Sequence, residues 1–191
     1  MATERTNSLV DFQHAIFAQI AAFQERGDER LCLRANAGDL HWAMDSGDIH
    51  LVAQMPKSLP NIPAAPAHIL GLVQHDSEVY TVFDFGAILT GKLTPRRNHN
   101  RVLVLHHDLL PGAALLVERT YSLIPMDDML VSSTPVTHEL ADTMLATKTG
   151  LEGRQENWNW LNFEKLLSGP AFASRRAEVA QIAPHVSKDA Q

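Results

Sequence analysis

Residues 62–85 read IPAAPAHILGLVQHDSEVYTVFDF, and the prediction of the fold starts from this stretch. Pro63 and Pro66 fix their own φ angles and push the residues before them toward extended backbone. Two runs rich in apolar residues flank the polar residues 74–78, and this pattern is typical of a β-hairpin. We therefore predict a stiff hairpin with an exposed polar tip. Such a tip is better suited to contacting another protein than to forming a deep catalytic pocket.

Short runs rich in apolar residues continue along the chain on both sides of this hairpin. They lie at 31–35, 40–44, 49–54, 101–106, 113–119, 141–148 and 156–161. Turn residues separate them, and the connections leave no room for the helical crossovers that a parallel sheet needs. The pattern predicts a mainly β protein built as barrels or a sandwich.

Three helices complete the predicted elements. The first spans 9–23, where apolar residues recur at three- and four-residue spacing. Short helices are expected at 84–89 and 162–167, the second with Asn162 as its N-cap. The predicted domains are an N-terminal extension with a helix (1–30), a central domain (31–168) and a C-terminal tail (169–191).

Composition excludes several classes of protein. A net charge of −6 argues against non-specific nucleic-acid binding, which needs a basic surface. The single cysteine, Cys32, excludes an intramolecular disulfide and lies between two leucines, so we expect it in the core. No apolar run approaches the ~20 residues of a membrane span, and no signal pattern begins the chain. We expect a cytoplasmic protein without membrane insertion.

One cluster has the residue types of a metal site: His106, His107 and Asp108. Neighbouring residues on a strand point to opposite faces, which disfavours a shared ion. A small metal-dependent hydrolase that uses these three residues, or the region of His75, remains the alternative function.

The second cluster, His75, Asp76 and Ser77, has the residue types of a hydrolase triad. Catalytic triads, however, assemble from separated segments of a chain. The sequence also lacks the glycine-rich loops that hold phosphates. We therefore predict no catalytic residue, no metal site and no cofactor, and the residues favour a binding module.

Four segments, in this order, resemble the CheW-like domain of bacterial chemosensory arrays. Residues 62–73 are similar to the family's P-A-[FY]-[IL]-x-G-[VL] pattern, and 79–85 to its P-[VI]-[VI]-D-[LM] strand. Residues 115–119 resemble its [GA]-[LI]-x-V-[DE] strand, and 162–167 its closing [ND]-[IL]-[ED]-[KR]-[LI]-[LF] helix. The resemblance extends over about residues 31–167.

The resemblance implies two five-stranded, SH3-like β-barrel subdomains that share a hydrophobic core. It also implies a non-catalytic adaptor that couples a methyl-accepting chemoreceptor to a CheA-type histidine kinase. The predicted N-terminal helix and the strand with Trp158 and Trp160 resemble the PilI-type branch of the family, which serves twitching motility and type IV pili.

The resemblance places partner-binding residues on one strand and one hairpin. They are Ile49, Leu51, Val52, Gln74, His75, Asp76, Ser77, Glu78 and Tyr80. The tip departs from the family, where it reads N-L-R-G, so an aspartate stands where the family has an arginine. Thr81 replaces a proline, and Leu51 stands where glutamate is common. A divergent CheW-like regulator with a different partner is therefore a further alternative.

Overall fold

The computed structural model describes residues 30–147 and 156–172 of the chain. The predicted helix at 9–23, the last residue of the strand predicted at 141–148, and most of the predicted tail lie outside these residues. No helix in the described part is long and apolar enough to cross a membrane.

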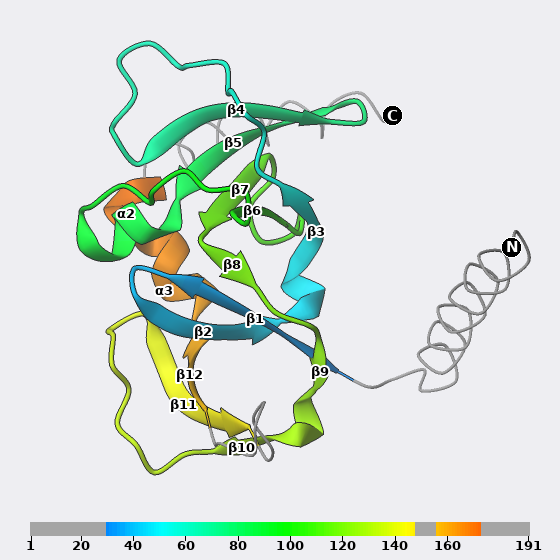
Figure 1. The fold of residues 1–191 in the computed structure, drawn as a ribbon, viewed down its shortest axis with the longest axis vertical. Coiled ribbons are helices and arrows are strands. Elements are labelled where there is room, and N and C mark those ends of the chain that lie inside the picture. The colour runs from blue at the N-terminus through cyan, green and yellow to red at the C-terminus, as the bar shows by residue number, and fades with distance from the viewer. Residues whose placement is uncertain (1–29, 148–155, 173–191) are drawn as a thin grey trace, which may run out of the picture. The chain divides into compact units, whose positions relative to one another are not determined.

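The described residues form a mainly β structure with short helices (Figure 1). The strands are β1 (Leu31–Ala37), β2 (Leu40–Asp45), β3 (Ile49–Gln54), β4 (Ile69–His75), β5 (Glu78–Asp84), β6 (Arg101–Leu105), β7 (Ala113–Val117), β8 (Arg119–Thr120), β9 (Ile124–Pro125), β10 (Met129–Val131), β11 (Ala141–Thr147) and β12 (Asn157–Leu161). The helices are α2 (Phe85–Thr90) and α3 (Phe163–Ser168), with 3-10 turns η1 (Ser46–Asp48), η2 (Met126–Asp128) and η4 (Pro170–Phe172).

The strands form two sheets. Sheet B has the order β3-β6-β7-β5-β4, and sheet A has the order β10-β11-β12-β2-β1-β8, with β9 also paired to β1. Figure 1 shows sheet B in the upper half of the view and sheet A in the lower half. Five strands of sheet A are longer than two residues, and β8 and β9 are two-residue additions at its edge.

Two strand pairs are parallel, which corrects the expectation that only antiparallel pairing has room. β5 pairs with β7, and β12 pairs with β2. The chain between β5 and β7 contains α2 and β6, so it is long enough for a parallel return. β2 and β12 come from opposite ends of the domain, and no local pattern predicts their pairing.

A shared hydrophobic core joins the two sheets. Leu103 and Leu105 of β6 belong to it, together with Leu33 of β1 and Leu161 of β12. The intervening residues Val102 and Val104 instead enter a separate cluster inside sheet B. A strand that is apolar on both faces is what a sheet buried on both sides requires. The predicted class of two SH3-like barrel subdomains with a common core is confirmed.

Side-chain caps set the starts of the two helices. Asp84 Oδ1 accepts a hydrogen bond from Ala87 N at 3.0 Å, and α2 begins at the next residue. Asn162 Oδ1 accepts one from Lys165 N at 2.7 Å, which confirms the predicted cap of α3. Helix α2 extends one residue beyond its predicted end, to Thr90, and Gly91 follows with φ 73°.

Gly71 explains how the proline-rich segment meets the central hairpin. Its φ is 136°, and a Cβ there would lie 2.3 Å from the carbonyl oxygen of Pro60. Leu72 N donates a hydrogen bond to that same oxygen at 3.0 Å. The segment before the hairpin therefore lies directly against β4, and only glycine allows this approach.

Some strands end at other residues than the sequence predicts. Strand β7 ends at Val117, two residues before its predicted end, because Glu118 N bonds to Asn36 O of β1 and the chain passes to sheet A. Strand β10 was not predicted, since three residues are too few to display an alternating pattern.

Candidate partner-binding surface

The central hairpin is longer than its sequence predicts. Its strands continue through the polar residues: His75 pairs with Glu78 and Gln74 pairs with Val79. Only Asp76 and Ser77 form the turn, whereas the sequence predicts a tip of five residues, 74–78. These strand ends are exposed, so polar side chains can continue the ladder without being buried.

The two-residue turn is held by its own side chains. Asp76 has φ 51°, a left-handed conformation that aspartate tolerates better than most residues. Gln74 Nε2 donates a hydrogen bond to Asp76 O at 3.1 Å, and His75 Nε2 lies 3.6 Å from Asp76 Oδ2. The Asp76 side chain is nevertheless 87% exposed. The tip thus presents a carboxylate in an ordered position.

Tyr80 links this tip to the interior of sheet B. Its side chain is buried in the cluster with Val82 and Leu116. Its hydroxyl donates a hydrogen bond to Glu78 Oε2. This hydrogen bond, and next the burial of the ring, raise the pKa of Tyr80 to about 12. The neutral Tyr80 hydroxyl therefore holds the Glu78 carboxylate in place by this hydrogen bond.

A cleft of about 460 Å³ lies beside the hairpin tip. It is lined by His50, His75, Asp76, Ser77, Glu78, Tyr80, Leu105, His106, His107 and Gly112. The fold therefore brings the predicted tip residues next to the two histidines that follow β6. The hairpin tip and the histidines after β6, which the sequence indicates as two separate regions, therefore line one cleft.

Strand β3 adds one exposed residue, His50, to the same cleft. Ile49 and Leu51 are half-buried and pack on the two apolar clusters, whereas His50 and Val52 are exposed. The prediction included Ile49, Leu51 and Val52 but missed His50, which lines the cleft. The alternating pattern of β3 could have predicted that His50 is exposed, because a strand residue between two inward-facing residues points outward.

His106, His107 and Asp108 lie in the turn after β6. His106 Nδ1 is 3.5 Å from Asp108 Oδ2, and His107 Nδ1 is 3.9 Å from Asp108 Oδ1. The side chains of His107 and Asp108 are 79% and 86% exposed. Among residues 30–147 and 156–172, no group of three potential ligands is arranged to hold a metal ion. The arrangement offers hydrogen bonds and charge to a partner.

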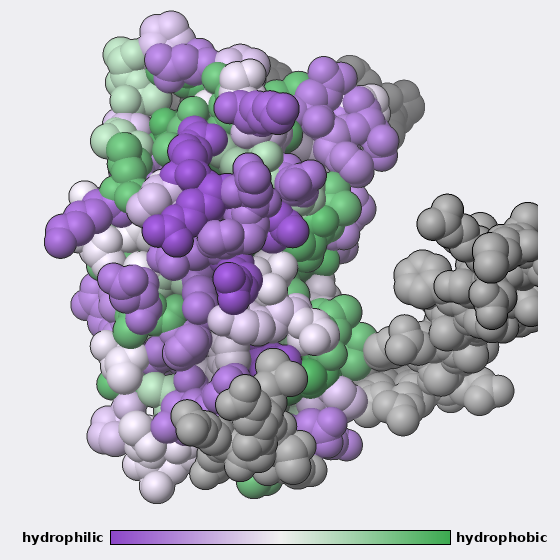
Figure 2. Space-filling view, in the orientation of Figure 1, coloured by the Kyte–Doolittle hydropathy of each residue, from purple (hydrophilic) through white to green (hydrophobic). Residues whose placement is uncertain are grey.

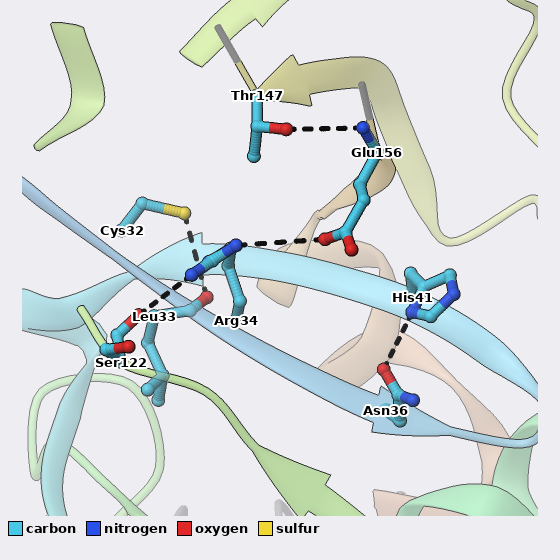
Figure 3. Close-up of polar contacts among 8 residues, drawn as sticks. All are labelled: Cys32, Leu33, Arg34, Asn36, His41, Ser122, Thr147 and Glu156. Carbon is cyan, nitrogen blue, oxygen red and sulfur yellow. Dashed lines mark hydrogen bonds and ion pairs between the residues drawn. The ribbon is translucent and has the colours of Figure 1, made fainter. Parts of the chain in front are cut away.

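A second polar centre, inside sheet A, has a structural role that the sequence did not indicate. Arg34 of β1 is buried, and its guanidinium lies 5.0 Å from the ring centre of Trp158. Figure 3 shows the guanidinium between Ser122 O, at 3.4 Å, and Glu156 Oε2, at 4.0 Å. Stacking on an aromatic ring offsets part of the cost of burying a cation. Trp158 is fully buried, as expected for a core residue.

Comparisons with known proteins agree with this geometry. The family model of the CheW-like domain matches residues 31–171. The solved structure of the scaffolding protein TtCheW from Thermoanaerobacter tengcongensis is similar, with a TM-score of 0.54 and 14% sequence identity. The match covers 70% of this chain and 84% of that chain. No curated protein sequence matches.

The family match begins at the first residue of β1 and ends within η4, so it contains every strand of both sheets among the described residues. It covers most of the chain, and the likeness to TtCheW supports the same fold independently. The chain belongs to the CheW-like domain family.

Proposed function

We propose that this chain is a non-catalytic adaptor that couples a methyl-accepting chemoreceptor to a CheA-type histidine kinase. The observation that carries the proposal is the family match over residues 31–171. The surface beside the hairpin supports it, because most of the polar side chains that line it are exposed and can contact a partner.

The proposed interface has an exposed layer and a supporting layer. Val52, Gln74, His75, Asp76, Ser77 and Glu78 are exposed and would contact the partner. Ile49, Leu51 and Tyr80 lie beneath them and hold the strands in place. A rigid support is what an interface needs, since less conformational entropy is then lost on binding.

The finer assignments are also proposals. The chain would act in the cytoplasm, in the PilI-type branch that serves type IV pili and twitching motility, or otherwise in chemotaxis. The adaptor domain would span 31–168, with an N-terminal extension (1–30) and a C-terminal tail (169–191). The start of β1 at Leu31 supports the proposed boundary between residues 30 and 31.

Co-sedimentation tests the proposed function. Purified chain is mixed with the regulatory domain of the CheA-type kinase from the same genome and with membranes that carry the chemoreceptor. We expect the chain to bind both and to increase the amount of kinase domain in the membrane pellet. If the chain binds neither at high micromolar concentration, the adaptor function is wrong and a divergent regulator with another partner is favoured.

A further inference from the structure

We propose that a basic cleft between the end of β3 and the segment from α2 to β6 binds an acidic peptide segment of a protein partner. The cleft has a volume of about 480 Å³ and is lined by Gln54, Met55, Pro56, Lys57, Arg96, Arg97 and Asn98. Among the described residues, it shares no lining residue with the cleft at the hairpin tip. The two clefts are therefore distinct sites.

The charge of the basic cleft contrasts with that of the whole chain. Lys57, Arg96 and Arg97 are exposed, and no ion pair within the described residues involves them. None of the described residues that line the cleft is a carboxylate, although the chain has a net charge of −6. Figure 2 shows hydrophilic residues over the region where the chain passes from α2 to β6. The three cations are thus available to an anionic ligand.

Buried polar side chains hold the loop that carries the two arginines. Asp84 is fully buried, and its carboxylate accepts hydrogen bonds from Thr94 N at 2.8 Å and Thr94 Oγ1 at 2.6 Å. At the other end, Asn100 is 1% exposed, accepts from Arg97 N and donates to Glu118 O at 3.3 Å. Both ends of the loop are fixed, so its arginines lose less freedom on binding.

The walls of the basic cleft are joined to each other. Met55 N donates a hydrogen bond to Asn100 O at 3.4 Å, which ties the end of β3 to the arginine loop. Met55 and Pro56 are half-buried and add apolar surface to the lining of the cleft. Arginine binds carboxylates through paired hydrogen bonds, and apolar lining residues accommodate the aliphatic part of a peptide.

These features favour a peptide over a nucleic acid. Three cations neutralise few phosphates, and the remainder of an acidic protein repels a long polyanion. A segment of a few residues with aspartate or glutamate side chains needs only the local positive charge. The occupant we assign is therefore an acidic, extended segment of a partner protein.

Fluorescence anisotropy tests this assignment with a labelled peptide of alternating glutamate and alanine, at low salt. A peptide with glutamine in place of glutamate is the negative probe. Three single variants are made: Arg96→Glu, Arg97→Glu and Lys57→Glu. If one of them fails to fold, the other two still test the site. Arg119→Glu is the matched control, because Arg119 is also exposed, lies on β8 and is absent from the cleft.

We expect the glutamate peptide to bind and each cleft variant to weaken its binding by about tenfold or more, because each variant removes a charge-assisted hydrogen bond and adds a charge that repels the peptide. Arg119→Glu should change the dissociation constant less than about twofold. Equal weakening by Arg119→Glu would show general charge attraction and overturn the site. Equal binding of the glutamine peptide would also overturn the site. Displacement of the glutamate peptide by inorganic phosphate, at a concentration equal to that of the peptide's carboxylates, would overturn it as well.

Discussion

Burial controls the chemistry of the single thiol. Cys32 is fully buried on β1 and packs with Trp158 and Leu145. Burial raises the pKa of this thiol from 9.0 to about 11, because the thiolate would lose its hydration. Only the thiolate is a good nucleophile, so the native protein should hardly react. Cys32 therefore acts as a small apolar residue.

Cys32 should react with a disulfide reagent at pH 8 about 100-fold more slowly, or slower still, in the native state than in denaturant. The reason is that a pKa raised from 9.0 to about 11 lowers the thiolate fraction by about that factor. The unfolded thiol ionises first as pH rises, so the free energy of unfolding should fall between about pH 9 and 11. This fall should be smaller in Cys32→Ala. Equal native and denatured rates would contradict the burial.

Single residues also show what the sequence could not predict. The two leucines beside Cys32 were enough to predict a buried cysteine. Nothing in the strand LCLRANA distinguishes Arg34 from an ordinary exposed arginine. Its burial depends on Trp158, which is more than a hundred residues away in the sequence and reaches it only through the pairing of β12 with β2.

Among the elements, the two helix caps have unequal roles. Asn162 caps α3 near the surface, with one bond to Lys165 N and one to Asp142. Asp84 caps α2 and also holds Thr94 through two further hydrogen bonds, all in a fully buried position. Loss of Asp84 would leave buried donors of Thr94 without a partner, which costs more than the loss of a cap alone.

Asp84→Ala should lower the free energy of unfolding by about 2–4 kcal/mol, the sum of a lost cap and unpaired buried donors. Asn162→Ala, the matched cap, should cost about 1 kcal/mol. Urea unfolding followed by circular dichroism measures both. Equal losses for the two variants would mean that the contact with Thr94 adds nothing to stability.

Element positions follow from local sequence better than element partners do. The strands of both hairpins and the cap of α3 were predictable, because turn residues and alternation act over a few residues. The parallel pairs β5–β7 and β2–β12 were not, because they depend on how the two sheets close around one core. Gly71 is similar: its contact with Pro60 is visible only in three dimensions.

The described residues form two sheets that share one core, and the polar cluster at the hairpin tip lies at the surface. The cleft at the hairpin tip gathers residues from β3, the central hairpin and the turn after β6. The sequence indicated the hairpin tip and the two histidines separately, and only the fold shows that they face one cleft. The fold thus assembles this surface from three segments that are separate in the sequence.

Asp76, the exposed carboxylate at the hairpin tip, is the residue through which the proposed kinase interface is best tested. Asp39 gives a matched control, because it is also exposed and lies in the turn between β1 and β2 with φ 61°, against 51° for Asp76. Asparagine tolerates the left-handed conformation at both positions, so each change removes a charge without straining the turn.

The most direct test is the dissociation constant of the complex with the CheA-type kinase regulatory domain, measured by calorimetry for the wild type, Asp76→Asn and Asp39→Asn. Removal of a charge paired across an interface should weaken binding by about tenfold for Asp76→Asn, and Asp39→Asn should leave it within about twofold. Equal affinities for all three proteins would contradict a role of Asp76 in binding and place the kinase interface away from the hairpin tip.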